Sequence, residues 1–173
     1  MLSTGPTTPS ERMWQEDTRQ ANHAFTLGHL KKAEQGYEAS LTTATTFFDT
    51  FKVSGQHLSS PVILTISYLN FADFFKKQGD LKKSLSFLKS ACTALIQASS
   101  LPTLPLEARL ACVEQLPSIV SLLTDYPDAL FDHHHDRDDL ITHARATALR
   151  VYQIAGYMPP TSPTSEPVKT YNA

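Results

Sequence analysis

Apolar residues recur at intervals of three and four along most of this chain, which is the spacing of one face of an α-helix. The pattern predicts about six helices, with approximate ranges 10–27, 29–53, 60–77, 81–99, 104–124 and 137–155. No stretch shows the alternating pattern and hairpin turn residues of a β-sheet. The sequence therefore predicts an all-α fold.

Local signals refine the ends of these helices. Ser10 is placed to cap the first helix, and Asp136 with Asp139 resembles a capping arrangement at the start of the last one. Pro117 lies inside the fifth predicted helix, where it lacks the N–H that a helix interior needs. We expect the fifth helix to kink or split near Leu116.

The two ends of the chain differ from the middle. Residues 1–9 and 158–173 are rich in Pro, Ser and Thr and have too few apolar groups to offset the entropy of ordering. Both are predicted to be disordered. Residues 10–157 between them are predicted to form one helical domain. Its helix pairs cover about 10–53, 60–99 and 104–156.

Two segments of the chain repeat one another. Each has a glycine, Gly28 or Gly79, followed by one polar residue and then Leu-Lys-Lys. A small residue stands seven positions before each glycine, and another stands five positions after it. The matched residues are Ala21 and Ala72, Leu30 and Leu81, Lys31 and Lys82, Lys32 and Lys83, Ala33 and Ser84, and Tyr37 and Leu88. Small side chains let two antiparallel helices approach closely, and a glycine lets the chain reverse tightly.

On these residues the chain resembles the tetratricopeptide repeat (TPR) family. The segment YLNFADFFKKQGDLKKSLSFLKSA, residues 68–91, follows the family spacing, and the first pair follows it less completely. The chain as a whole is similar to short bacterial TPR proteins without an assigned function. The resemblance implies TPR-like antiparallel helix pairs in a compact, right-handed helical-repeat domain. The two glycines are 51 residues apart, however, against a usual TPR period of about 34.

The resemblance also implies a groove lined by the first helix of each pair. Carried over by position, its residues are Gln15, Thr18, Asn22, Phe25, Ile66, Leu69, Asn70, Asp73 and Lys76. Some TPR domains hold a peptide carboxylate with two asparagines and several basic residues. Asn22 and Asn70 stand at the asparagine positions, but Thr18 replaces the first lysine. A groove for a helical or extended peptide is the alternative for the same surface.

Composition narrows the possible partners. The chain has 15 Lys and Arg against 17 Asp and Glu, a net charge of −2, which argues against a nucleic-acid partner. No stretch of 18 apolar residues is present, so no membrane partner is expected. Two cysteines favour a reducing cytoplasm over a disulfide framework. Only six glycines occur and none forms a phosphate loop, and no cofactor is expected.

Two further features bear on chemistry. In DHHHDRDDLITHA, residues 132–144, His135, Asp139 and His143 are spaced to share one side of a helix. Two imidazoles and a carboxylate are suitable ligands for Zn²⁺ or Ni²⁺. The alternative is a solvated, acidic helix start. Cys92 and Cys112 fall on helix faces that are predicted to be buried, which favours packing over reactivity.

These observations favour a non-enzymatic adaptor or scaffold that binds a protein or peptide partner. A secretion-type chaperone that cradles a client is the first alternative. A metal-binding protein or metal-dependent hydrolase built on the His-rich segment is the second. A further alternative is a homodimer that forms through an exposed apolar face. Leu69 is one residue that would lie in such an interface.

Overall fold

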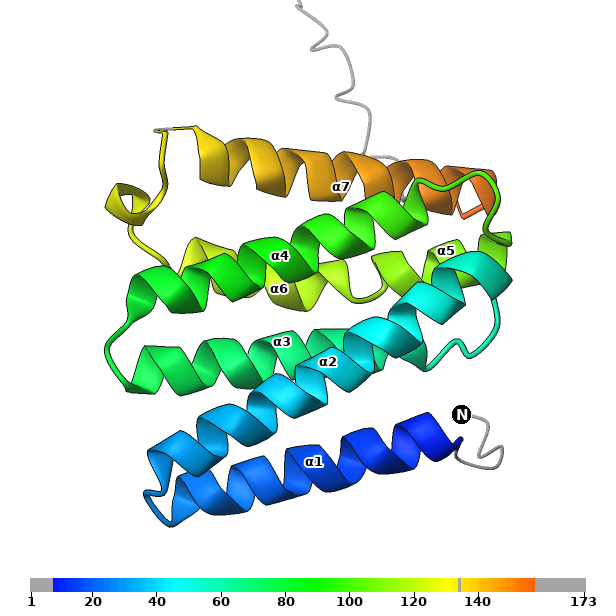
Figure 1. Ribbon diagram of the computed structural model, residues 1–173. Coiled ribbons are helices and arrows are strands. Elements are labelled where there is room, and N and C mark those ends of the chain that lie inside the picture. Colours follow the sequence, from blue (N-terminus) through cyan, green and yellow to red (C-terminus); the bar gives the residue numbers. More distant parts are fainter. Residues whose placement is uncertain (1–7, 134, 158–173) are drawn as a thin grey trace, which may run out of the picture.

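The computed structural model describes residues 8–133 and 135–157 and is built from helices (Figure 1). No β-strand occurs in these ranges, and the predicted all-α fold is confirmed. The elements are α1 (Pro9–Thr26), α2 (Leu30–Ser54), α3 (Ser60–Lys77), α4 (Leu81–Ser99), α5 (Leu106–Val113), α6 (Leu116–Thr124), the 3-10 helix η1 (Asp128–Leu130) and α7 (Asp136–Ile154).

The first four helices form two antiparallel pairs, α1 with α2 and α3 with α4. Gly28 and Gly79 join the helices of each pair and have φ values of 74° and 82°, in the left-handed region that favours glycine. The amide that follows each glycine, in His29 and in Asp80, donates to the carbonyl oxygen five residues earlier. The two turns therefore close their helices with the same hydrogen bonds, as the sequence repeat predicts.

The helix predicted over 104–124 is split in two, as expected from Pro117. Helix α5 ends at Val113, and α6 begins at Leu116 with Pro117 in its first turn. Proline is tolerated there because the first amides of a helix have no partner within it. Helices α5 and α6 both pack against α7.

The predicted caps at both ends of the domain are wrong. Thr8 caps α1, since its hydroxyl accepts from the Glu11 amide at 3.1 Å and its own amide donates to the Glu11 carboxylate at 2.7 Å. Thr8 and Pro9 thus belong to the helical domain. Helix α7 follows His135, which makes no side-chain capping bond. Asp136 instead accepts from the His133 amide at 3.2 Å. The predictions of disorder for 1–7 and 158–173 lie outside the described residues.

The main core surrounds α4, which lies between α3 and the group α5, α6 and α7 (Figure 1). Its largest fully buried side chains include Phe51, Leu64, Leu88, Leu95, Leu116, Ile119, Leu123 and Val151. In the loop between α2 and α3, Gly55 lies close to Pro105 and to the core residue Leu104. A Cβ there would lie 2.6 Å from Pro105 Cδ, so a larger residue at position 55 would have to displace Pro105.

A second, smaller core joins the helix pairs near the glycine turns. It consists of Ala21, Ala24, Ala33, Tyr37, Phe71, Phe74 and Phe75. Helices α1 and α2 approach closely here because Gly36 has no side chain. A Cβ at Gly36 would lie 2.8 Å from Ala21 Cβ.

Four large apolar residues in the periodic pattern of the helices are exposed. These are Met13, Leu30, Ile66 and Leu81, with exposed fractions of 55%, 42%, 37% and 36%. Leu30 and Leu81 are the first residues of α2 and α4. Periodicity identifies the apolar face of a helix but does not show where its neighbours end. Within the described residues, none of the helices has the length and hydropathy to cross a membrane.

Candidate interaction surface on α1 and α3

Helices α1 and α3 lie side by side and are joined at both ends and near the middle. The Ser59 hydroxyl, just before α3, donates to the Glu11 carboxylate. Trp14 Nε1 donates to Ser67 Oγ at 2.7 Å. The Phe25 and Phe74 rings, farther along, meet edge to face with centroids 5.5 Å apart. The first helices of the two pairs are therefore neighbours, as the TPR resemblance implies.

The nine residues predicted for the groove lie on these two helices, and we call them the α1–α3 surface. Exposed members are Gln15, Asn22, Ile66, Asp73 and Lys76, and half-buried members are Thr18, Phe25, Leu69 and Asn70. None of the nine is buried, so each contributes to the molecular surface.

The structure links several of them through contacts with Tyr37 and Lys77. Tyr37 is 5% exposed, and its hydroxyl donates to Asn22 Oδ1 at 2.7 Å. Burial raises the pKa of Tyr37, and the charge of Asp73 raises this pKa further. Asp73 forms an ion pair with Lys77 at 2.7 Å, and Lys77 Nζ lies 5.3 Å from the centre of the Phe25 ring. Asn22, Phe25 and Asp73 thus form one cluster with Tyr37 and Lys77.

Sequence reasoning missed Tyr37 and Lys77 as members of this cluster. Tyr37 belongs to α2, the second helix of its pair, whereas the family spacing takes the groove residues from the first helices. Lys77 follows Lys76, and the family spacing selected Lys76 alone. Lys76 in fact lies over the Tyr126 ring, with Nζ 5.4 Å from its centre, and so points toward the segment before η1.

Other predicted members have different surroundings. The Thr18 and Ser40 hydroxyl oxygens are 2.7 Å apart, so Thr18 helps to join α1 to α2. Leu69 packs against the main core. Within residues 8–133 and 135–157 the Asn70 side chain makes no hydrogen bond to the protein, which leaves its amide available to a ligand.

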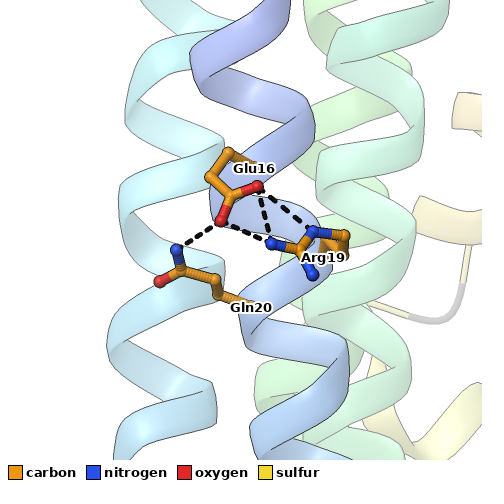
Figure 2. Close-up of polar contacts among 3 residues, drawn as sticks. All are labelled: Glu16, Arg19 and Gln20. Atoms are coloured by element: carbon orange, nitrogen blue, oxygen red, sulfur yellow. Dashed lines mark hydrogen bonds and ion pairs between the residues drawn. The ribbon is translucent and has the colours of Figure 1, made fainter.

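The outward side of α1 carries a polar network of its own (Figure 2). The Arg19 guanidinium donates to both Glu16 carboxylate oxygens, at 2.7 and 2.9 Å, and Gln20 donates to the same carboxylate at 2.6 Å. The hydrogen bonds from Arg19 lower the pKa of Glu16. This side of the helix is well suited to contact with water.

The His-rich segment does not form a metal site in the part of the chain that is described. The His135 carbonyl accepts from the Asp139 amide at 2.9 Å, as at any helix start, and Asp139 and His143 are exposed. Among the described residues, no three His, Cys, Asp or Glu side chains are placed to hold a metal ion. His135, Asp139 and His143 are not brought together, and His134 lies outside the described residues.

Both cysteines face the core, as predicted. Cys92 and Cys112 are free and fully buried. Burial raises the pKa of Cys92 to about 11 and that of Cys112 to about 12. Both thiols are therefore protonated at neutral pH and poorly suited to act as nucleophiles.

Two hollows lie elsewhere on the described surface, and sequence reasoning missed both. One, of about 450 Å³, lies between α6 and α7. The other, of about 500 Å³, lies between the start of α1 and the second half of α2. Its lining includes the exposed Met13, together with Phe47 and His57. Each hollow depends on how two helices cross, which no local pattern encodes.

The fold is that of an all-α protein built from antiparallel helix pairs. Residues 12–149 match the family model described as "Protein of unknown function (DUF2753)", and the chain belongs to this family. Nothing matches the chain in comparisons with curated proteins and with solved structures.

Proposed function

We propose that this chain is a non-enzymatic, TPR-like adaptor that binds an extended segment of a protein partner along the α1–α3 surface. One observation supports this most directly. Asn22 on α1 accepts from the hydroxyl of the buried Tyr37, and Lys77 on α3 pairs with Asp73 and lies over the Phe25 ring of α1. Amide, aromatic and charged groups are thereby positioned before any ligand arrives.

The chemistry of this cluster suits the backbone of a peptide. Because Asn22 Oδ1 already accepts from Tyr37, the Asn22 amide group is oriented and can donate to a peptide carbonyl. Asn70 offers a second amide, and Ile66 with Leu69 offers apolar surface on the same helix. A prepositioned surface loses less entropy on binding than a mobile one.

The remaining features agree with an adaptor in a reducing cytoplasm. The repeated glycine turns support the TPR resemblance. The two cysteines are unpaired and buried, so the fold does not depend on a disulfide. A chaperone would use the same α1–α3 surface for an extended client. No observation favours the metal-dependent alternative.

The test is to capture partners from native lysate, purify the dominant one and titrate it against two variants. Ile66→Glu and Asn70→Ala should each weaken binding, the first at least about tenfold because it places a charge on the apolar surface. Gln153→Ala, on the exposed side of α7, is the matched control. Equal affinities for all three variants, with unchanged circular dichroism, would show that the partner binds elsewhere.

A further inference from the structure

The two glycine turns, at Gly28 and Gly79, lie at the same end of the molecule (Figure 1). Six lysines stand within four residues of these glycines, and all six are exposed. We call them the lysine patch: Lys31, Lys32, Lys76, Lys77, Lys82 and Lys83. Only Lys76 belongs to the α1–α3 surface, so most of the patch lies outside the groove that the TPR resemblance implies.

Four of these lysines stand where a helix disfavours positive charge. Lys31 and Lys32 lie in the first turn of α2, Lys82 and Lys83 lie in the first turn of α4, and neither turn contains an acidic residue. The start of a helix carries a partial positive charge, which repels lysine and attracts carboxylates. Helices α1, α5 and α7 follow this rule and have acidic residues in their first turns. Proteins break such local rules mainly at functional sites.

The acidic side chains nearby do not neutralise the patch. Glu34 pairs with Lys83 at 3.5 Å, and Asp73 pairs with Lys77 at 2.7 Å. Asp80 accepts from the backbone amide of Lys83 at 2.9 Å. Within residues 8–133 and 135–157, the other four lysines form no ion pair: Lys31, Lys32, Lys76 and Lys82. This end therefore keeps a local excess of positive charge, although the net charge of the whole chain is −2.

The patch connects the α1–α3 surface to the starts of α2 and α4. Lys77 Nζ lies 5.3 Å from the centre of the Phe25 ring, and Lys83 Nζ lies 3.9 Å from the centre of the Phe75 ring. Phe75 belongs to the smaller core and Phe25 packs against it, so the two lysines lie over one core. The ion pair of Lys83 with Glu34 joins the start of α4 to α2. A segment bound along the α1–α3 surface can continue from there onto the patch.

We propose that the partner segment is acidic, and that its aspartate or glutamate side chains contact the lysine patch across the starts of α2 and α4. This inference rests on the proposed adaptor function and adds the chemistry of the partner. Carboxylates meet both the lysine ammonium groups and the positive ends of two helices there, so the charges are complementary.

A narrow segment suits this end better than a membrane or a nucleic acid. Lys76 lies over the Tyr126 ring, and the exposed Asp125 and Asp128 stand on either side of Tyr126 in the chain. A broad anionic surface that covered the patch would come close to these two carboxylates and be repelled by them. A single extended segment can lie across α2 and α4 without approaching them.

The experiment is fluorescence anisotropy on the full chain with a labelled peptide of alternating glutamate and leucine. The same peptide with glutamine in place of glutamate is its control. The glutamate peptide should bind at least about tenfold more tightly at low salt, and this difference should shrink as the salt concentration rises, because salt screens exposed charges. Lys31→Gln combined with Lys82→Gln should weaken the glutamate peptide at least about fivefold and leave the glutamine peptide unchanged.

Arg145→Gln combined with Arg150→Gln is the matched control, since it removes the same charge from exposed positions of α7. It should change either affinity by less than about twofold, because distant surface charges are screened. Urea denaturation supplies a second readout. The lysine variant should be at least as stable as the unchanged chain, because it removes positive charge from the starts of two helices. A loss of affinity would then not reflect a loss of the fold.

Asn70→Ala separates this inference from the proposed function, because it should weaken both peptides by the same factor. If it does so and the lysine variant changes neither affinity, the adaptor function stands and the acidic preference is wrong. If the lysine variant weakens the glutamate peptide and Asn70→Ala changes neither affinity, the proposed function is wrong and carboxylate binding by the lysine patch stands.

Three further outcomes would overturn the inference. The two peptides could bind equally, which would mean that charge plays no part. The lysine and arginine variants could weaken the glutamate peptide equally, which would mean that net charge attracts it rather than the lysine patch. Phosphatidylserine vesicles could bind the chain through Lys31 and Lys82 while the glutamate peptide does not bind, which would assign the patch to a membrane surface.

Discussion

Helices α1 and α7 occupy opposite ends of the stack and are attached to it in different ways. The fully buried residues of α1 are two alanines, Ala21 and Ala24. Side-chain hydrogen bonds hold the rest of α1. Trp14 donates to Ser67, the Thr18 and Ser40 hydroxyl groups share one bond, and Tyr37 donates to Asn22. The corresponding distances are all 2.7 Å.

Helix α7 depends more on apolar burial. Ile141, Ala144 and Val151 are buried against α4, α5 and α6. Its start has no side-chain cap, whereas α1 begins with the Thr8–Glu11 capping box. The difference shows that one small domain can hold its edge helices by specific polar contacts at one end and by apolar area at the other. Hydrogen bonds fix relative position more strictly than apolar contact does, because their geometry is directional.

The largest effect is expected where α7 loses apolar contact. Ile141→Ala should reduce the free energy of unfolding by about 3 kcal/mol, because it removes a buried side chain and leaves a cavity. Urea denaturation followed by circular dichroism measures this. Thr142→Ala, at the exposed neighbouring position, should change stability by less than about 0.5 kcal/mol. Equal effects of the two changes would mean that α7 is not held by burial at Ile141.

A smaller effect is expected at the close approach of α1 and α2. Gly36→Val should cost about 2 kcal/mol, because the new side chain collides with Ala21 and must push α1 away. Hydrogen exchange should then increase in α1 more than in α7. Ala39→Val, on the exposed side of the same helix, is the control for the added side chain alone. Unchanged exchange in α1 after Gly36→Val would contradict the close contact.

The smallest effect is expected at the start of α1 and depends on pH. Burial acts to raise the pKa of Glu11, but hydrogen bonds from Ser59 and Thr8 outweigh it, and the net pKa is lowered from 4.5. A lowered folded-state pKa stabilises the protein at neutral pH, and this contribution is lost as the pH falls below about 4.5. Glu11→Gln should therefore reduce stability at neutral pH and have less effect in acid.

Urea denaturation of Glu11→Gln and the unchanged chain, at neutral pH and in acid, tests this prediction. Thr8→Ala is the matched change, since it removes the other half of the same capping box. The two changes together should cost less than the sum of each alone. A Glu11→Gln effect that is constant with pH would show that the carboxylate charge contributes nothing.

For the candidate site, the family spacing selected residues on α1 and α3 but not the contacts between them. It placed Asn22, Phe25 and Asp73 on one surface, and the structure groups all three. It could not identify Tyr37, which reaches this surface from another helix, or show that Lys76 turns toward Tyr126. Positions along one helix follow from sequence, but contacts between helices depend on their separation and crossing angle.

The sequence alone determined the helices, the glycine turns and the break at Pro117. These features follow from local hydrogen bonding and backbone freedom, which neighbouring residues set. The Thr8–Glu11 cap is also a local feature, and the predicted cap at Ser10 lies two residues too late. The tertiary structure alone decided which apolar residues are covered, and it left Met13 and Ile66 exposed. It also formed the hollow between α6 and α7. Burial depends on how far a distant neighbour extends, and no local pattern contains that distance.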